Sequence, residues 1–165
     1  PNCGVINAGG HGLYVRESSR ANARLGVFSG AAQDGIFFAD CSYGDVHGST
    51  ADDAGRYGVH ATGSSSVYAA GMSVKNAGTA CVRALDASRI SCTSAIATGG
   101  GDFGLRAQAG SVISAFEANA RKGASDSPSD ISVSGGSIIH ATGAIGGVSI
   151  AVNVWGTSGC IIQGN

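Results

Sequence analysis

The sequence predicts an all-β fold, a right-handed single-stranded parallel β-helix with about six coils of about 23 residues each. Three features that recur every 23 residues predict it. The first is a small residue that starts each unit, at Gly12, Gly35, Gly58, Cys81 and Gly104. The second is the apolar residue that follows each start, at Leu13, Ile36, Val59, Val82 and Leu105. The third is a serine seven places after each start, at Ser19, Ser42, Ser65, Ser88 and Ser111.

Each unit has room for three short strands joined by turns, which we expect near positions 1–3, 8–12 and 14–18 after the starting residue. In the first strand, apolar residues one and three places after the start alternate with a variable residue, which is typical of a strand with one buried face. A unit of this length is too short for a strand and a useful helix. We therefore expect successive coils to stack in parallel about 4.8 Å apart, with the right-handed crossover that parallel strands prefer.

Two adjacent small residues close each unit, and they predict a corner with positive φ or a close approach of two backbones. They are Ala8–Gly9, Ala31–Ala32, Ala54–Gly55, Ala77–Gly78, Gly100–Gly101 and Gly123–Ala124. The inward columns are rich in Ala and Val, so the interior is expected to be narrow. Cys92 falls in one of these columns and is predicted to be a small buried side chain. Since a narrow interior buries little apolar area, we also expect a homotrimer.

We interpret residues 1–165 as one β-helix domain and expect it to be part of a longer chain, because it begins in the middle of a coil. Residues 1–11 would end a preceding coil, 12–152 would form six coils, and 153–165 would form a partial coil or cap that includes Trp155. Three extra residues within 124–130 predict a surface turn before the sixth coil begins at Asp130.

The composition limits the partners and cofactors. A net charge of −1 offers no field to attract nucleic acid or an anionic membrane. No apolar run approaches the length of a membrane span, so membrane insertion is not expected. The five cysteines are odd in number and have no metal-binding spacing, which argues against a disulfide framework and favours folding in a reducing cytoplasm. We expect no metal and no cofactor.

One outward column crosses the middle of the first strands, and it contains Tyr14, Phe37, His60, Arg83 and Arg106. Aromatic rings pack on the apolar faces of sugars, and arginine holds carboxylates by paired hydrogen bonds. We therefore interpret the column as a glycan-binding strip, about 19 Å long at the spacing of stacked strands. A solvated face and a contact between subunits are the alternative interpretations.

A second column, five places after the start, contains Glu17, Asp40 and Asp86, with Gly63 between the two aspartates. Carboxylates in adjacent coils would lie about 5 Å apart, which is the separation that retaining glycosidases use. Glu17 and Asp40 are therefore the candidate catalytic pair. The alternative is that they are turn residues at a strand end. We interpret the serine column as a hydrogen-bonded ladder, because no histidine falls beside it in register to act as a base.

The coils resemble the parallel β-helix of bacteriophage tailspikes and related pectate-lyase-like proteins. The resemblance rests on variants of one rung, GSSSVYAAG, GSVISAFEANA and GSIIHATGA, and on their Gly/Ala corners. It implies a trimeric receptor-binding module in a virion tail, made in the host cytoplasm, that binds host cell-surface polysaccharide with or without depolymerising it. The chain has no Arg-x-Pro-x-x-Arg stretch and no Asp-Pro-His motif, so no catalytic residue carries over from the resemblance.

Two other functions stay open on the sequence. One is a secreted, monomeric polysaccharide lyase, hydrolase or epimerase of the β-helix class. The other is a non-catalytic adhesin stalk. An upstream signal peptide would favour the secreted enzyme, whereas an upstream virion-attachment domain would favour the tailspike.

Overall fold

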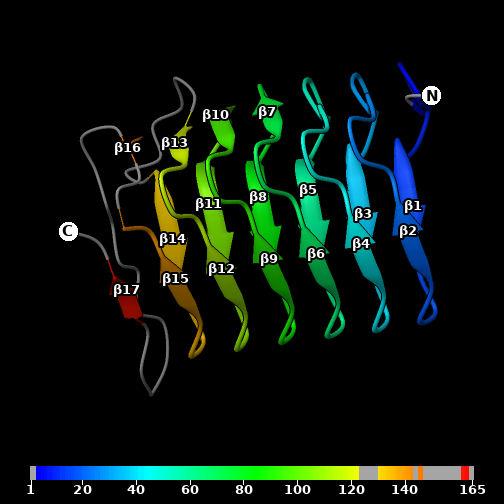
Figure 1. The fold of residues 1–165 in the computed structure, drawn as a ribbon. Helices are drawn as coiled ribbons and strands as arrows, with labels where there is room; N and C mark the ends of the chain where they lie inside the picture. The colour runs from blue at the N-terminus through cyan, green and yellow to red at the C-terminus, as the bar shows by residue number, and fades with distance from the viewer. Residues whose placement is uncertain (1–2, 123–129, 143–144, 147–160, 164–165) are drawn as a thin grey trace.

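The computed structural model describes residues 3–122, 130–142, 145–146 and 161–163, and none of them is helical. They form the expected right-handed parallel β-helix of about 23 residues per coil, with about five full turns. Figure 1 shows the strands stacked side by side from β1 near the N-terminus to β14 and β17.

Sheet 1 contains the first strand of each coil, and its register confirms the predicted columns. In order along the sheet, its strands are β1 (Leu13–Val15), β3 (Ile36–Phe38), β5 (Tyr57–Ala61), β8 (Ala80–Ala84), β11 (Phe103–Ala107) and β14 (Ile131–Val133). Leu105 lies opposite Ile131, a step of 26 residues, as three extra residues before the sixth coil require. The inserted segment itself, residues 123–129, lies outside the described residues.

Sheets 2 and 3 contain the second and third strands of the coils. The strands of sheet 2 are β2 (Arg20–Asn22), β4 (Tyr43–Asp45), β6 (Ser66–Tyr68), β9 (Arg89–Ser91), β12 (Val112–Ser114), β15 (Ile138–His140) and β17 (Ile161–Gln163). The strands of sheet 3 are β7 (Ser73–Lys75), β10 (Ile96–Gly100), β13 (Asn119–Lys122) and β16 (Ile145–Gly146). Earlier coils contribute to sheet 3 only as isolated parallel bridges, which join Gly4, Val27, Thr50 and Ser73. Trp155 and the expected cap lie outside the described residues, apart from β17.

Large and small side chains complement one another inside the narrow core. Phe38 is fully buried, and a Cβ at Gly44 would collide with its ring. One coil later the same two columns contain Ala61 and Val67, so in that coil the larger side chain belongs to the second strand and the smaller one to the first. Cys92 is buried as predicted, and burial raises the pKa of its thiol to about 12.

The serine column forms the predicted ladder from Ser42 onward, whereas Ser19 is exposed and its N–H donates to the carbonyl of Arg16 instead. The backbone N–H groups of Ser42, Ser65 and Ser88 each donate to the hydroxyl of the serine one coil further on, at 3.1 to 3.2 Å. Ser111 donates to the hydroxyl of Ser137 in the same way, at 3.0 Å. The hydroxyls of Ser65, Ser88, Ser111 and Ser137 thus join adjacent coils at the corner, and because these serines are buried their hydroxyls are not accessible to a ligand.

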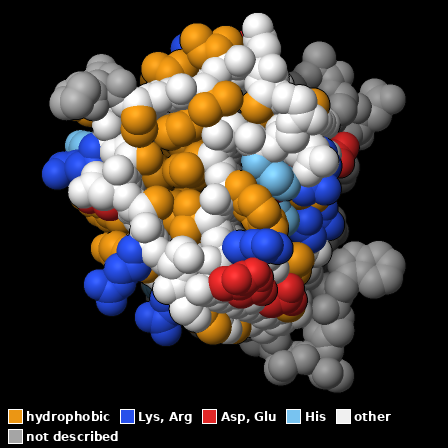
Figure 2. All heavy atoms as spheres, turned by 90° about the vertical axis from the view of Figure 1, so that its right-hand side faces the viewer, with side chains coloured by type: hydrophobic (Ala, Val, Ile, Leu, Met, Phe, Trp, Pro, Cys, Tyr) orange, Lys and Arg blue, Asp and Glu red, His pale blue; other side chains and the backbone are white. Residues whose placement is uncertain are grey.

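The corner glycines Gly55, Gly78 and Gly101 permit close backbone contact and do not have positive φ. A Cβ at Gly78 would collide with the carbonyl oxygen of Gly55, and a Cβ at Gly55 with that of Ala32, although neither glycine has a positive φ. Figure 2 looks onto the N-terminal end of the stack, where apolar side chains of the first coil lie open. Leu13 and Ala21 are accordingly only partly buried, whereas their counterparts Ile36 and Val67 are buried.

Candidate functional site

The predicted strip lies in register on the outward side of sheet 1. Each member is paired with the next along the stack, in the order Tyr14, Phe37, His60, Arg83 and Arg106. Exposure differs sharply within the strip: the exposed fraction of Tyr14 is 50%, whereas that of His60 is 6%. The strip is therefore not an evenly open surface.

The aromatic half of the strip is a stacked column of rings. The centroids of Tyr14 and Phe37 lie 5.3 Å apart with nearly parallel planes, and those of Phe37 and His60 lie 4.9 Å apart. His11 packs beside the column, with its ring 4.8 Å from Phe37. Phe37 thus has a ring on each side along the stack. A ligand approaching sheet 1 would meet the ring edges of Phe37 and His60, whereas Tyr14, at the end of the stack, is half exposed.

A buried carboxylate holds the centre of this face together. Asp34 is fully buried, and its two oxygens accept hydrogen bonds at 3.0 Å from Nε and Nη2 of Arg56. Nδ1 of His60 lies 3.1 Å from Oδ2 of Asp34, and Nδ1 of His11 lies 3.6 Å from the same oxygen. Nε2 of His60 is buried and has no hydrogen-bond partner. The cluster thus fixes His60 through one ring nitrogen only.

The charges around Asp34 explain its protonation state. Burial alone would raise the pKa of its carboxyl group, but the hydrogen bonds from His60 and Arg56 outweigh burial and hold the pKa below its ordinary value. Burial lowers the pKa of His11, and the charge of Asp34 only partly opposes that effect. Asp34 is therefore an ionised group inside the fold, held by hydrogen bonds from His60 and Arg56.

The cationic half of the strip contacts neutral and aromatic side chains in the described part of the chain. Nη1 of Arg83 donates to the phenol oxygen of Tyr57 at 2.7 Å, and Nη2 donates to the side-chain oxygen of Gln108 at 3.1 Å. The guanidinium of Arg106 lies over the ring of Phe103, 5.0 Å from its centroid. Within the described residues, neither arginine forms an ion pair with Asp or Glu, and both Nε atoms are buried without a hydrogen-bond partner.

The two arginines also repel each other, because they are adjacent in the register of β8 and β11. Burial, and then the charge of Arg83, lower the pKa of Arg106, whereas Tyr57 and Asp102 have smaller, opposite effects. Two partly buried cations lie side by side here, and no described carboxylate pairs with either, so an anion would be stabilised between them.

Sequence reasoning missed the groups that surround the strip, namely Asp34, Arg56, Tyr57 and His11. A signal was present, since His11, Asp34 and Tyr57 occupy one column, directly before the start residue of three successive units. What the spacing could not reveal is that this column and the strip lie on the same face and contact each other across the strand.

The candidate carboxylates Glu17 and Asp40 lie in stacked turns, where the N–H of Ser18 donates to the carbonyl of Asp40 at 2.7 Å. Both have positive φ, 58° and 56°, as has Gly63 in the same column. Asp and Gly tolerate this backbone conformation better than most residues, which accounts for much of the column's composition. Glu17 is exposed and pairs with its neighbour Arg16 at 3.1 Å.

Among the described residues, no three His, Cys, Asp or Glu side chains gather as a metal site would require. The same part of the chain contains no helix of the length and hydropathy needed to cross a membrane.

Comparison with known proteins gives one match. All of the chain, residues 1–165, matches the family described as "Right handed beta helix region". Searches of the curated proteins and of the solved structures found no match.

Proposed function

The chain belongs to the right-handed β-helix family, and from that premise we propose that it binds an acidic polysaccharide on the outward face of sheet 1. The family's domain is found in polysaccharide-acting and in adhesin-like proteins. The observation that carries the proposal is the pair Arg83 and Arg106, two adjacent cations without an acidic partner among the described residues.

The surroundings of the pair suit a carboxylated sugar. The guanidinium carbon of Arg83 lies over the ring of Tyr57, 4.8 Å from the ring centroid, and this contact holds the guanidinium group in place. Phe103 supports Arg106 in the same way. A guanidinium held by an aromatic ring loses less rotamer freedom on binding, and its remaining N–H groups match the geometry of a carboxylate. Tyr14, Phe37 and His60 would extend the contact along the stack through their ring edges.

Arg83→Gln and Arg106→Gln are each expected to weaken binding to a carboxylated polysaccharide by about 1 to 3 kcal/mol, the usual range for losing a charged hot spot. Phe37→Ala should weaken it by a similar amount, because its ring supports the column. Binding to polygalacturonate, with neutral dextran for comparison, measures the effect. Arg121→Gln is the matched control, since Arg121 is exposed on sheet 3. Equal binding by all four variants and the unaltered protein would rule out the sheet 1 face.

We further propose that the chain is part of a phage tailspike or tail fibre, which acts outside the cell at the virion tail and binds host cell-surface polysaccharide as a homotrimer. The narrow core supports the trimer, because its inward columns are largely Ala and Val and bury little apolar area per coil. Light scattering at micromolar concentration should give three times the mass of one chain. A monomer mass for the folded protein would instead favour the secreted enzyme or the adhesin stalk.

Depolymerisation is the second candidate, and the stacking of the turns that carry Glu17 and Asp40 favours it. If these carboxylates act as a pair, Glu17→Gln and Asp40→Asn should each reduce the release of reducing ends by at least about a hundredfold and leave binding unchanged. Release that is the same in both variants and in the unaltered protein would remove Glu17 and Asp40 from the mechanism.

A further inference from the structure

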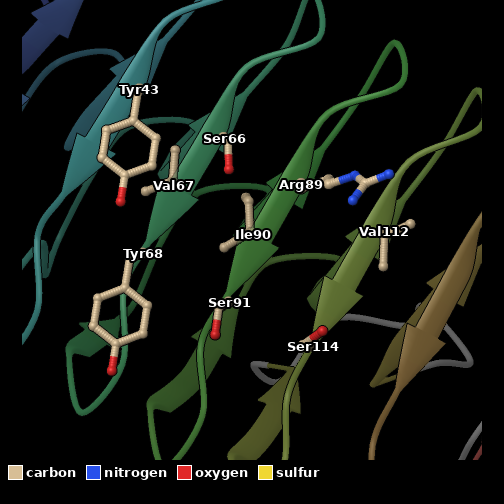
Figure 3. Close-up of a pocket in the computed structure, with 9 residues that line it drawn as sticks. All are labelled: Tyr43, Ser66, Val67, Tyr68, Arg89, Ile90, Ser91, Val112 and Ser114. Atoms are coloured by element: carbon tan, nitrogen blue, oxygen red, sulfur yellow. The ribbon is translucent and has the colours of Figure 1, made fainter. Parts of the chain in front are cut away.

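Sheet 2 carries a hollow on a different face from the proposed polysaccharide site. Its volume is about 330 Å³, at the small end of the range for ligand pockets. Figure 3 shows Tyr43 and Tyr68 on one side of the hollow, Arg89 on the other, and small serine side chains between them. We call it the sheet 2 hollow, and its floor is formed by Ser66, Ser91 and Ser114.

The register of sheet 2 explains why this surface is hollowed. Ser66 lies between Tyr43 and Arg89 in one outward column, so a small side chain separates two large ones that lie two coils, or about 9.6 Å, apart. In the neighbouring outward column, Tyr68 is followed by Ser91 and then Ser114. The floor of small side chains therefore extends over three coils, and Tyr43 and Tyr68 border it on the N-terminal side.

The polar groups of the hollow have no partners within the described part of the chain. The hydroxyls of its three floor serines, the phenol groups of Tyr43 and Tyr68, and the guanidinium of Arg89 form no hydrogen bond or ion pair there. The buried serines one residue earlier, Ser65 and Ser88, are by contrast bonded into the ladder. The tyrosines are 49% and 41% exposed, which is high for rings of this size.

This combination fits one class of ligand. Exposed tyrosine rings contact the apolar face of a sugar, serine hydroxyls exchange hydrogen bonds with its hydroxyl groups, and an unpaired arginine at the far side takes a carboxylate. We propose that the sheet 2 hollow binds a single uronic acid residue, a pyranose ring that carries a carboxylate. This site is separate from the face with Arg83 and Arg106, and its existence does not depend on that face.

A contact between subunits fits the same surface less well. The cores of protein interfaces are depleted of charge and closely packed. Here the floor is a row of hydroxyl groups without a partner among the described residues, and the cation Arg89 lies at the edge. The small, polar and concave shape instead matches a ligand that brings its own hydroxyl groups.

The test uses methyl β-D-glucuronide as the probe and methyl β-D-glucoside as its uncharged counterpart, with binding measured by titration calorimetry and saturation-transfer NMR. The glucuronide should bind about tenfold more tightly than the glucoside, the scale expected for one charge-assisted contact. Arg89→Gln should remove this preference, and Ser91→Leu, which fills the floor, should abolish binding of both. Tyr68→Ala should weaken both glycosides about tenfold.

Two controls separate this site from others. Arg20→Gln changes an exposed arginine in the same outward column, next to Tyr43 in the register, and should leave binding unchanged. The double variant Arg83→Gln/Arg106→Gln should also leave it unchanged, whether or not that variant still binds polysaccharide. Circular dichroism and the melting temperature verify that each variant is folded.

Three results would overturn the proposal. The first is that neither glycoside binds the folded protein. The second is that both glycosides still bind Ser91→Leu and the preference for the glucuronide persists in Arg89→Gln, or that binding is lost in Arg83→Gln/Arg106→Gln. The third is that Tyr68→Ala changes the oligomeric mass while the unaltered protein binds no glycoside, which would assign the hollow to a subunit contact.

Discussion

Arg56→Gln is expected to lower the free energy of unfolding by about 3 kcal/mol at pH 8, the lower end of the range for breaking a buried ion pair. The reason is that Asp34 is fully buried, and both hydrogen bonds from its main cation are lost. Arg56 itself is half exposed, so the cost arises almost wholly from the carboxylate left inside the protein. Chemical denaturation of both proteins at matched pH measures the difference.

The deficit should shrink as the pH falls below about 4, the ordinary pKa of an aspartic acid. Burial raises the pKa of Asp34, but hydrogen bonds from His60 and Arg56 hold it below that value in the unaltered protein. This stabilisation is present above the ordinary pKa and is lost as the carboxyl group becomes protonated. The unaltered protein should therefore lose more stability than the variant as the pH falls.

Two variants serve as controls for Arg56. Arg16→Gln removes an exposed ion pair with Glu17 and should cost no more than about 1 kcal/mol. The double variant Arg56→Gln/Asp34→Asn removes the buried charge as well, so it should recover most of the loss. A deficit that is the same at pH 3 and pH 8, and is not reduced in the double variant, would show that Arg56 acts through packing alone.

Phe38→Ala is expected to lower the free energy of unfolding by about 3 to 5 kcal/mol, because it empties the space of the fully buried ring. Gly44→Val should also be destabilising, by about 1 to 3 kcal/mol or more, since a Cβ at Gly44 collides with that ring. Both effects follow from one shared volume inside the second coil. Thermal and denaturant unfolding of the two single variants test them.

The double variant Phe38→Ala/Gly44→Val should be much more stable than the sum of the single effects predicts. It gives the second coil the pair that the third coil already has, Ala61 and Val67. A double-mutant cycle should therefore show a favourable coupling of at least about 2 kcal/mol. Additive losses would mean that the two positions do not share a volume, which would contradict the packing described here.

Much of the fold was predictable because parallel, in-register stacking turns a sequence spacing into a spatial contact. A residue 23 places further on is the neighbour in the next coil, so Tyr14, Phe37 and His60 could be placed side by side from the sequence alone. Their ring orientation could not be predicted in this way. The column alone is compatible with rings that lie flat and open to a sugar, whereas the structure stacks them on one another.

The Asp34 cluster shows where the repeat stops being informative. Asp34 is 26 residues from His60 and 22 from Arg56, so neither contact falls on the 23-residue repeat. Both contacts join side chains of different columns, close to the corner at which the first strand of a coil begins. Such contacts depend on the direction in which a side chain leaves the backbone at a corner, which the spacing does not specify.

By itself, then, the sequence determined the period, the inward columns and the neighbours along the stack, because each follows from one repeated spacing and the alternation of a strand. Only the tertiary structure decided which columns meet around Asp34, that Arg83 and Arg106 lack an acidic partner among the described residues, and that Ser66 leaves a hollow between Tyr43 and Arg89. These features depend on the directions of side chains and on the space left where a small side chain lies between two large ones. A linear repeat specifies neither.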